Sequence, residues 1–168
     1  MAGVSTKEIK TRIRSMESTR QITRAMEMVA SAKLRKAQVQ ALSSRPYFET
    51  LYAAMWDIVN HNSDFSSPYL TQKDGKKAAF VVISGDRGLA GGYNSNILKL
   101  LTTCKEGKDA VLLPIGKKGA DHFKAHRIPV LTENYTQAET VSIGDCFSVA
   151  KQLCKGYVRG EYDGVYVV

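Results

Sequence analysis

The feature that most constrains the fold is a long stretch without helix-breaking residues. Between positions 4 and 60 the sequence contains no glycine and a single proline, Pro46. Alanine, methionine, lysine, arginine, glutamine and glutamate dominate the stretch, and all of them favour the α-helix. Ser5 and Glu8 have the spacing of a capping box, which marks the start of a helix. We therefore predict that residues 1–60 form a first domain consisting of one long helix, kinked near Pro46, whose ring clashes with the preceding turn.

Apolar residues recur along this helix at intervals of three and four positions. In the first half they are Ile9, Ile13, Met16, Ile22, Met26 and Val29, interrupted by Thr19 and Lys33. This is the period of a coiled coil, so the first half is expected to pair weakly with another helix. After Pro46 the stripe is stronger and is formed by Tyr47, Leu51, Met55 and Val59, with Phe48, Tyr52 and Ile58 beside them. The second half is expected to dock on a core.

The positive charge is concentrated on the same helix. The chain has 168 residues and a net charge of +8, and residues 1–45 hold 10 Lys/Arg against 3 Asp/Glu, a net of +7. Such a segment is expected to meet an acidic or membrane-apposed partner. The basic side chains could follow a nucleic-acid backbone or meet carboxylates of protein partners. No aromatic residue precedes Tyr47, which removes base stacking, and the salt dependence of DNA binding would separate the two alternatives.

The rest of the chain follows a different pattern. Residues 61–76 are rich in turn-forming residues and predict a linker. Within 77–168, strands are predicted at 77–84, 110–116, 128–131 and 162–168, and helices at 92–105, 117–126 and 139–158. Near-continuous apolar strands that alternate with helices indicate a parallel sheet covered on both faces. The predicted fold class is α/β, with a long N-terminal coiled-coil helix followed by a Rossmann-like parallel-sheet domain. Because the sequence stops within the last predicted strand, we expect it to be the front part of a longer polypeptide.

A glycine-rich loop at 85–94 follows the first predicted strand, which is where α/β folds hold phosphates. A dinucleotide fingerprint would require glycine at positions occupied by Arg87 and Ala90, and the Gly-Lys-Ser/Thr ending of a Walker A loop is missing. The glycines are therefore expected to provide a tight turn and close packing, with Asp86 and Arg87 facing solvent or a partner. A nucleotide-binding enzyme stays a third alternative.

Catalytic and metal-binding patterns are sparse. His122 and His126 have a spacing that can bind a metal, but no further ligand lies nearby in the sequence, and the three cysteines form no C-x-x-C pair. No nucleophile elbow, zinc-protease motif or paired-carboxylate pattern occurs. We expect no catalytic site and no cofactor or metal. No apolar run is long enough to span a membrane and no secretory signal opens the chain, so an intracellular protein is expected.

Three segments resemble the gamma subunit of F-type ATP synthases, and the resemblance spans essentially the whole chain. They are residues 22–38 (ITRAMEMVASAKLRKAQ), 44–47 (SRPY) and 86–94 (DRGLAGGYN). The resemblance already begins at residues 7–13, with no transit peptide before them, and this resembles the bacterial type. The resemblance implies a rotor whose N-terminal helix pairs with a long C-terminal helix inside a ring of three alpha and three beta subunits. That C-terminal helix would follow Val168 and is absent from this sequence.

The resemblance also implies contacts and partners. It places six residues near acidic lever loops of the beta subunits, namely Arg24, Met26, Lys33, Arg35, Lys36 and Arg87. It places Arg45 and Tyr47 near the c-ring and the epsilon subunit, where the α/β domain forms the foot of the stalk. Proton flow through the c-ring would drive rotation, and catalysis would take place on beta. The protein would be peripheral, on the cytoplasmic face of the bacterial inner membrane, with no nucleotide or nucleic acid bound. Many relatives carry cysteine where Ala90 stands, so that position needs no thiol chemistry.

Overall fold

The computed structural model describes residues 5–61, 66–70, 73 and 75–168. The chain divides into two compact units, Met1–Phe65 and Ser66–Val168. The linker predicted at 61–76 includes residues 62–65, 71–72 and 74, which lie outside the described residues.

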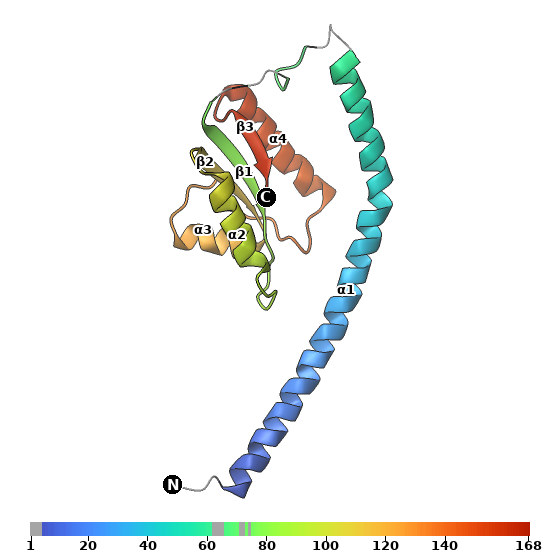
Figure 1. The fold of residues 1–168 in the computed structure, drawn as a ribbon, viewed down its shortest axis with the longest axis vertical. Helices are drawn as coiled ribbons and strands as arrows, with labels where there is room; N and C mark the ends of the chain where they lie inside the picture. Colours follow the sequence, from blue (N-terminus) through green and yellow to red (C-terminus); the bar gives the residue numbers. More distant parts are fainter. Residues whose placement is uncertain (1–4, 62–65, 71–72, 74) are drawn as a thin grey trace. The chain divides into compact units, whose positions relative to one another are not determined.

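In the first unit, the described residues after Ser5 form one helix, α1, from Thr6 to His61 (Figure 1). At a rise of about 1.5 Å per residue, its 56 residues extend over about 84 Å. The predicted capping residues act at its start: the Glu8 carboxylate accepts the Ser5 backbone N–H at 3.3 Å, and the Ser5 hydroxyl oxygen accepts the Lys7 N–H at 3.3 Å. The predicted long helix is confirmed. The assigned helix continues through Pro46, and the kink there stays a prediction.

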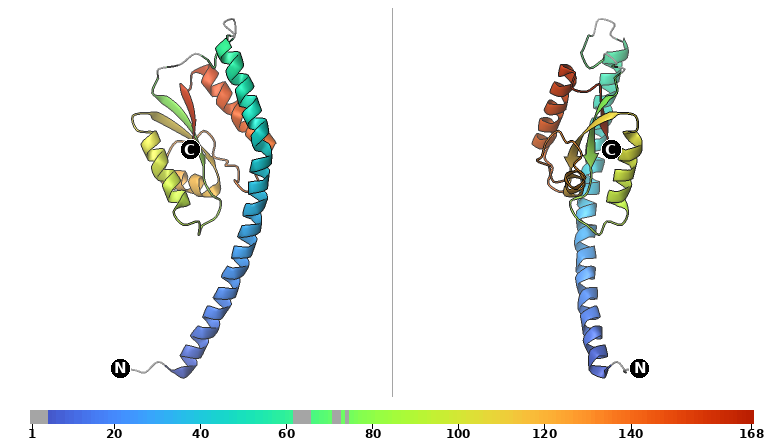
Figure 2. Two further views of the ribbon diagram at one scale, coloured as in Figure 1. Left: turned by 45° about the vertical axis from the view of Figure 1, so that its right-hand side comes forward. Right: turned by 90° about the vertical axis from the view of Figure 1, so that its left-hand side faces the viewer.

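The second unit contains a parallel three-stranded sheet in the order β2-β1-β3. Its strands are β1 (Lys77–Ile83), β2 (Asp109–Ile115) and β3 (Gly164–Val167). Its helices are α2 (Tyr93–Cys104), α3 (Lys117–Ala125) and α4 (Ile143–Arg159). Figure 2 shows α2 and α4 on opposite sides of the sheet. The predicted α/β class with a parallel sheet is confirmed.

Strand β1 lies in the middle of the sheet and contributes to a core on each face. Phe80 and its same-face neighbours pack with residues from α2, β2 and α3, forming the cluster Ala78, Phe80, Val82, Leu101, Leu112 and Phe123. The alternate residues of β1 pack toward α4, in the cluster Ala79, Val81, Leu113, Leu153 and Tyr162. Burial on both faces explains why β1 is a continuous apolar run and not an alternating one.

The strand predicted at 128–131 is wrong. Val130 forms only an isolated parallel bridge with Leu112. The neighbouring Pro129 has no N–H to donate, although its carbonyl accepts the Leu112 N–H at 3.3 Å. Leu131 then donates its N–H to the Leu112 carbonyl at 2.7 Å. The segment therefore covers the outer edge of β2 without extending the sheet as a strand.

Two other predicted boundaries shift. Helix α4 begins at Ile143 and not at 139, because Ser142 caps it: its hydroxyl accepts the Asp145 N–H at 3.2 Å, and the Asp145 carboxylate accepts the Ser142 N–H at 2.9 Å. The last strand is assigned to Gly164–Val167 within the predicted 162–168. Residue Val168 still donates its N–H to the Val81 carbonyl at 2.9 Å, so the ladder continues to the last residue.

Candidate interaction surfaces

Helix α1 presents its whole circumference without a single buried residue. The contact residues predicted on it are all exposed: Arg24, Met26, Lys33, Arg35, Lys36, Arg45 and Tyr47. Large apolar side chains on the same helix are exposed as well, including Ile13, Val29 and Phe48. Within this unit the helix is therefore held by its own backbone bonds and caps, and its apolar residues form an open surface.

The predicted beta-subunit contacts on α1 do not form one patch. At 3.6 residues per turn, Met26, Lys33 and Lys36 fall within an arc of about 80°, on the side of the helix that carries Met26 of the apolar seam. Arg24 and Arg35 are about three turns apart and lie on the roughly opposite side of the helix. A partner that met all five residues would have to approach α1 from two sides, or two partners would have to share them.

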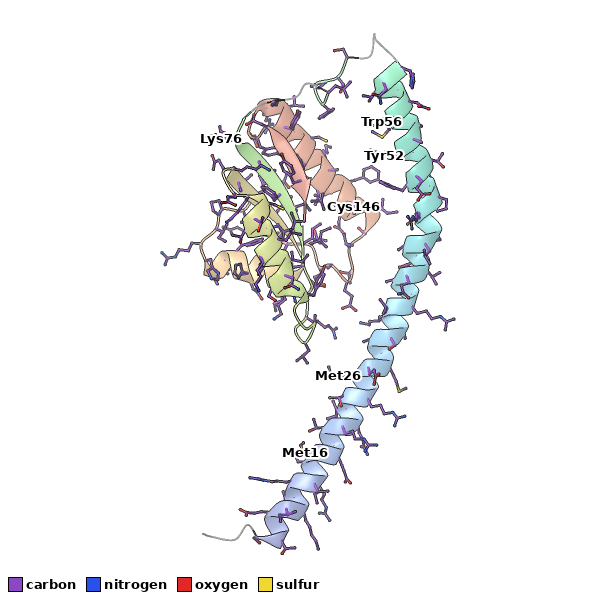
Figure 3. All side chains as sticks on the ribbon, in the orientation of Figure 1. Met16, Met26, Tyr52, Trp56, Lys76 and Cys146 are labelled. Carbon is purple, nitrogen blue, oxygen red and sulfur yellow. The ribbon has the colours of Figure 1, made fainter. Side chains whose placement is uncertain are left out.

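The end of α1 that follows Arg45 is the more aromatic part. The Arg45 guanidinium pairs with the Glu49 carboxylate, Nε to Oε1, at 2.9 Å on the solvent-exposed surface. Phe48, Tyr52 and Trp56 stack in sequence, with ring centroids 6.1 and 6.4 Å apart. Figure 3 labels Tyr52 and Trp56 on successive turns. Trp56 was not among the expected stripe residues, although its spacing of four from Tyr52 is the signal that identifies it.

In the α/β unit, the loop between β1 and α2 is fixed by Asp86. One carboxylate oxygen accepts the Lys117 N–H at 2.9 Å and the other accepts the Glu139 N–H at 2.8 Å. Gly116, the N-cap residue of α3, has no side chain that could accept a backbone N–H of the first turn. Asp86 accepts the Lys117 N–H instead, although it lies 31 residues away in the sequence. The carboxylate of Asp86 is thus used within the fold, which was not expected, although the residue is only half-buried and stays partly open to solvent.

The hydrogen bonds of Asp86 outweigh its partial burial. Burial alone would raise the pKa of the carboxyl, but the backbone N–H groups of Glu139, Lys117 and Ala138, together with the charge of Arg87, hold that pKa below its ordinary value. The carboxylate form is the one that the loop requires. Asp86 is thus a structural anion at the start of α3.

Arg87 is placed as expected, on the exposed side of this loop. Its side chain is 80% exposed, and its guanidinium lies 3.6 Å from the Glu139 carboxylate. An exposed pair of this kind contributes little to stability. Arg87 is therefore sterically accessible to a partner, and its predicted contact stays a prediction.

The ends of β1 and β2 approach each other at a buried serine that sequence reasoning did not identify. The Ser84 hydroxyl accepts the Gly119 N–H at 2.8 Å and lies 3.1 Å from the Ile115 carbonyl, to which it donates. Gly116 has φ +93°, and a Cβ there would overlap the Ser84 carbonyl oxygen. These contacts explain why positions 84, 116 and 119 hold a serine and two glycines. In the sequence, the one indication of this arrangement is a glycine directly after a strand.

The histidine pair lies at the end of α3. His126 Nδ1 is 2.8 Å from the His122 carbonyl oxygen, and the two ring centroids are 4.1 Å apart. Burial, the neighbouring His126 and Lys105 together lower the pKa of His122. Among the residues that the structure describes, no group of three or more His, Cys, Asp or Glu side chains could hold a metal ion. None of the helices in the described ranges combines the length and apolarity needed to cross a membrane.

Comparison with known proteins identifies a matching family model and several similar sequences. The family model described as ATP synthase matches residues 5–168. The sodium-ion-specific ATP synthase gamma chain of Acetobacterium woodii is 40% identical over 161 residues, which cover 95% of this chain and 53% of that protein. The ATP synthase gamma chain of Heliobacterium modesticaldum is 39% identical, covering 96% and 56%, and that of Glaesserella parasuis is 36% identical, covering 100% and 59%. The chain thus spans a little over half the length of these curated relatives.

Proposed function

Because this chain belongs to the ATP synthase gamma-chain family, we propose that it forms part of the central stalk, the rotor, of an F-type ATP synthase. The observation that carries the proposal is α1. A helix of 56 residues with no buried residue and an apolar seam is suited to a shaft that is completed by a second helix and surrounded by other subunits.

The proposed surroundings of the shaft are the three alpha and three beta subunits. A shaft that turns inside a sleeve must not be held by deep apolar packing at one angle. The small and charged residues in the first half of α1 would keep the barriers to rotation low and similar at successive angles. Arg24, Met26, Lys33, Arg35 and Lys36 would meet acidic segments of beta, with Arg87 making a similar contact from the α/β unit. The placement of Arg24 and Arg35 opposite the seam fits a shaft that is contacted on more than one side.

The α/β unit would form the foot of the stalk, with the epsilon subunit and the c-ring as neighbours. Arg45 and Tyr47 would approach this end. Tyr47 is exposed, and the aromatic ridge of Phe48, Tyr52 and Trp56 follows it. In this proposal the subunit binds no nucleotide, nucleic acid or cofactor, and catalysis takes place on beta.

The coupling ion is proposed to be the proton, moving through the c-ring. The relative from Acetobacterium woodii is named sodium-ion specific, so sodium is the alternative to test. The proposed location is peripheral, on the cytoplasmic face of the bacterial inner membrane. Ion uptake into vesicles during ATP hydrolysis distinguishes the two ions. An uncoupler should abolish the uptake if the ion is the proton, and omission of sodium should abolish it if the ion is sodium.

The direct test is assembly. The gamma protein that carries this sequence is co-expressed with its alpha and beta subunits, purified through a tag on beta, and assayed for ATP hydrolysis. The proposal predicts a stable complex whose hydrolysis rate exceeds that of alpha and beta alone. A protein that fails to co-purify, or that binds DNA with a steep salt dependence instead, would overturn it.

A further inference from the structure

The tip of the loop between β1 and α2 carries one large apolar side chain, and that side chain is almost fully exposed. Leu89 is 95% exposed, the highest value among the exposed large apolar residues described. Its φ is +61°, in the left-handed region that leucine rarely adopts. A leucine that is both exposed and strained does not stabilise this unit. Its presence calls for an explanation outside the unit.

The neighbouring Gly88 raises the same question. Its φ does not lie in the left-handed region, and a Cβ built on it would meet no atom within 4 Å. Neither backbone conformation nor packing inside the described residues therefore requires glycine at this position. Gly116 is the contrast, because it has a positive φ and a crowded Cβ position. A glycine that its own unit does not require is expected where another surface comes close to the backbone.

The tip rests on a well-anchored base. Asp86 bonds two backbone N–H groups from other parts of the unit, at 2.9 and 2.8 Å. On the other side, the Asn94 side-chain oxygen accepts the Gly85 N–H at 2.8 Å, and the Tyr93 hydroxyl donates to the Ile83 carbonyl at 3.3 Å. The loop projects beyond the end of the sheet in Figure 1. Leu89 is thus presented on a preorganised base, which reduces the entropy lost on binding.

The charges around the tip are arranged with cations outward. Arg87, Lys117 and Lys118 are exposed, and the backbone of both lysines bonds to the base of the loop. Against these three cations stand the carboxylate of Asp86, which accepts two backbone N–H groups, and that of Glu139, which lies 3.6 Å from the Arg87 guanidinium. The face that a partner would meet is therefore an apolar tip with a cationic rim, which fits an apolar recess bordered by carboxylates.

We propose that Leu89 anchors this loop in an apolar recess on an acidic protein surface, and that Gly88 lacks a side chain because that surface passes directly over it. This inference rests on the proposed function, in which the acidic surface belongs to a beta subunit, and it adds a contact residue and a clearance requirement to the contact of Arg87. The energy of the contact comes from burying Leu89, and the cationic rim selects the partner.

The test uses the assembled complex of the gamma protein with alpha and beta. Leu89→Asn removes the apolar side chain and places a residue that tolerates the left-handed conformation, so the variant should be at least as stable as wild type. Gly88→Val adds a side chain at a position where a Cβ would meet no atom of the unit within 4 Å. Both should weaken binding to alpha and beta by about tenfold or more, as anchor residues of interfaces do. Matched controls are Ile143→Asn, at an isoleucine that is 77% exposed, and Gly144→Val, whose Cβ would meet only the Ser142 hydroxyl at 3.6 Å.

The outcomes separate this inference from the proposed function. Wild-type protein that does not bind alpha and beta overturns both. Wild-type binding with unchanged binding of the Leu89 and Gly88 variants overturns only the anchor. Loss of binding in those variants accompanied by a lower melting temperature than wild type also overturns it, because the residues would then be structural. Weakened binding at unchanged or raised stability, with both controls within about twofold of wild type, is the expected result.

Discussion

Helix α1 and strand β1 are both rich in apolar residues, but the fold uses them in opposite ways. Five of the seven residues of β1 are buried, between helices on both faces of the sheet. None of the 56 residues of α1 is buried. The strand is stabilised by residues far away in the sequence, whereas the helix is stabilised by bonds between residues three to four positions apart. Apolar content alone therefore does not show whether a segment belongs to a core or to an interface.

The difference has an energetic consequence. In proteins, most of the stability of a helix comes from the tertiary packing of its apolar face and not from intrinsic propensity. Local side-chain bonds, such as that of the Thr50 hydroxyl to the Pro46 carbonyl at 2.8 Å, do not replace packing. We expect α1 to fray or self-associate when the chain is alone and to become ordered along its length when partners cover it.

The largest expected effect is at Gly116. Gly116→Ala places a Cβ against the Ser84 carbonyl oxygen at a φ of +93°, so the ends of β1 and β2 must separate. We predict a loss of about 4 kcal/mol or more in the free energy of unfolding of the α/β unit. Urea denaturation followed by circular dichroism measures it. Gly107→Ala is the control, because Gly107 has φ +71° but open space around its Cβ, and it should cost only about 1 kcal/mol.

A matched pair of leucines tests the comparison directly. Leu112→Ala removes a side chain that is fully buried beneath α2 and α3 and should cost about 3 kcal/mol. Leu42→Ala changes a side chain of α1 that is 66% exposed and should alter unfolding of the chain alone by less than about 0.5 kcal/mol. Equal losses at the two positions in the chain alone would show that α1 has a core of its own.

Asp86 gives a smaller effect with a defined pH dependence. Its pKa in the folded unit lies below the ordinary value of 3.8, so its contribution to stability is present above pH 3.8 and is lost as the pH falls through the folded-state pKa. Asp86→Asn should cost about 1 kcal/mol at neutral pH. The difference between wild type and variant should shrink below pH 3.8. A difference that stays constant down to the lowest pH would show that the charge is not what the loop requires.

The smallest expected effect is at the carboxylate of Glu49 on α1. It pairs with Arg45 at 2.9 Å, but both side chains are exposed. Glu49→Ala should change the helicity and stability of the chain by about 0.3 kcal/mol or less. A circular dichroism melt at low and high salt measures it. A loss as large as that of Asp86→Asn would remove the distinction drawn here between the two carboxylates.

Much of this fold follows from local sequence patterns. The extent of α1 is set by the absence of glycine and by the Ser5 cap, and β1 by its apolar run, so both are recognisable from the sequence. The strand predicted at 128–131 failed because an apolar run does not reveal its pairing, and Pro129 has no N–H for a ladder. The start of α4 was misplaced because Ser142 and Asp145, which form its capping box, were not recognised.

The loop surface was only partly predictable. Arg87 is exposed as expected, but the hydrogen bonds of Asp86 were not foreseen, because its partners Lys117 and Glu139 lie 31 and 53 residues away. No local pattern reports contacts of that range. The strain at Leu89 and the open space at Gly88 likewise became visible only in three dimensions. The contacts of α1 with other subunits rest on the family resemblance, since a lone helix does not identify what covers it.

Amide hydrogen exchange of the chain alone and in complex with alpha and beta compares the protection of α1 and β1 in the two states. We expect that in the chain alone the amides of α1 exchange much faster than those of β1, and that in the complex the α1 amides become strongly protected while those of β1 change little. Protection of α1 equal to that of β1 in the chain alone, or no gain in α1 protection within the complex, would contradict it.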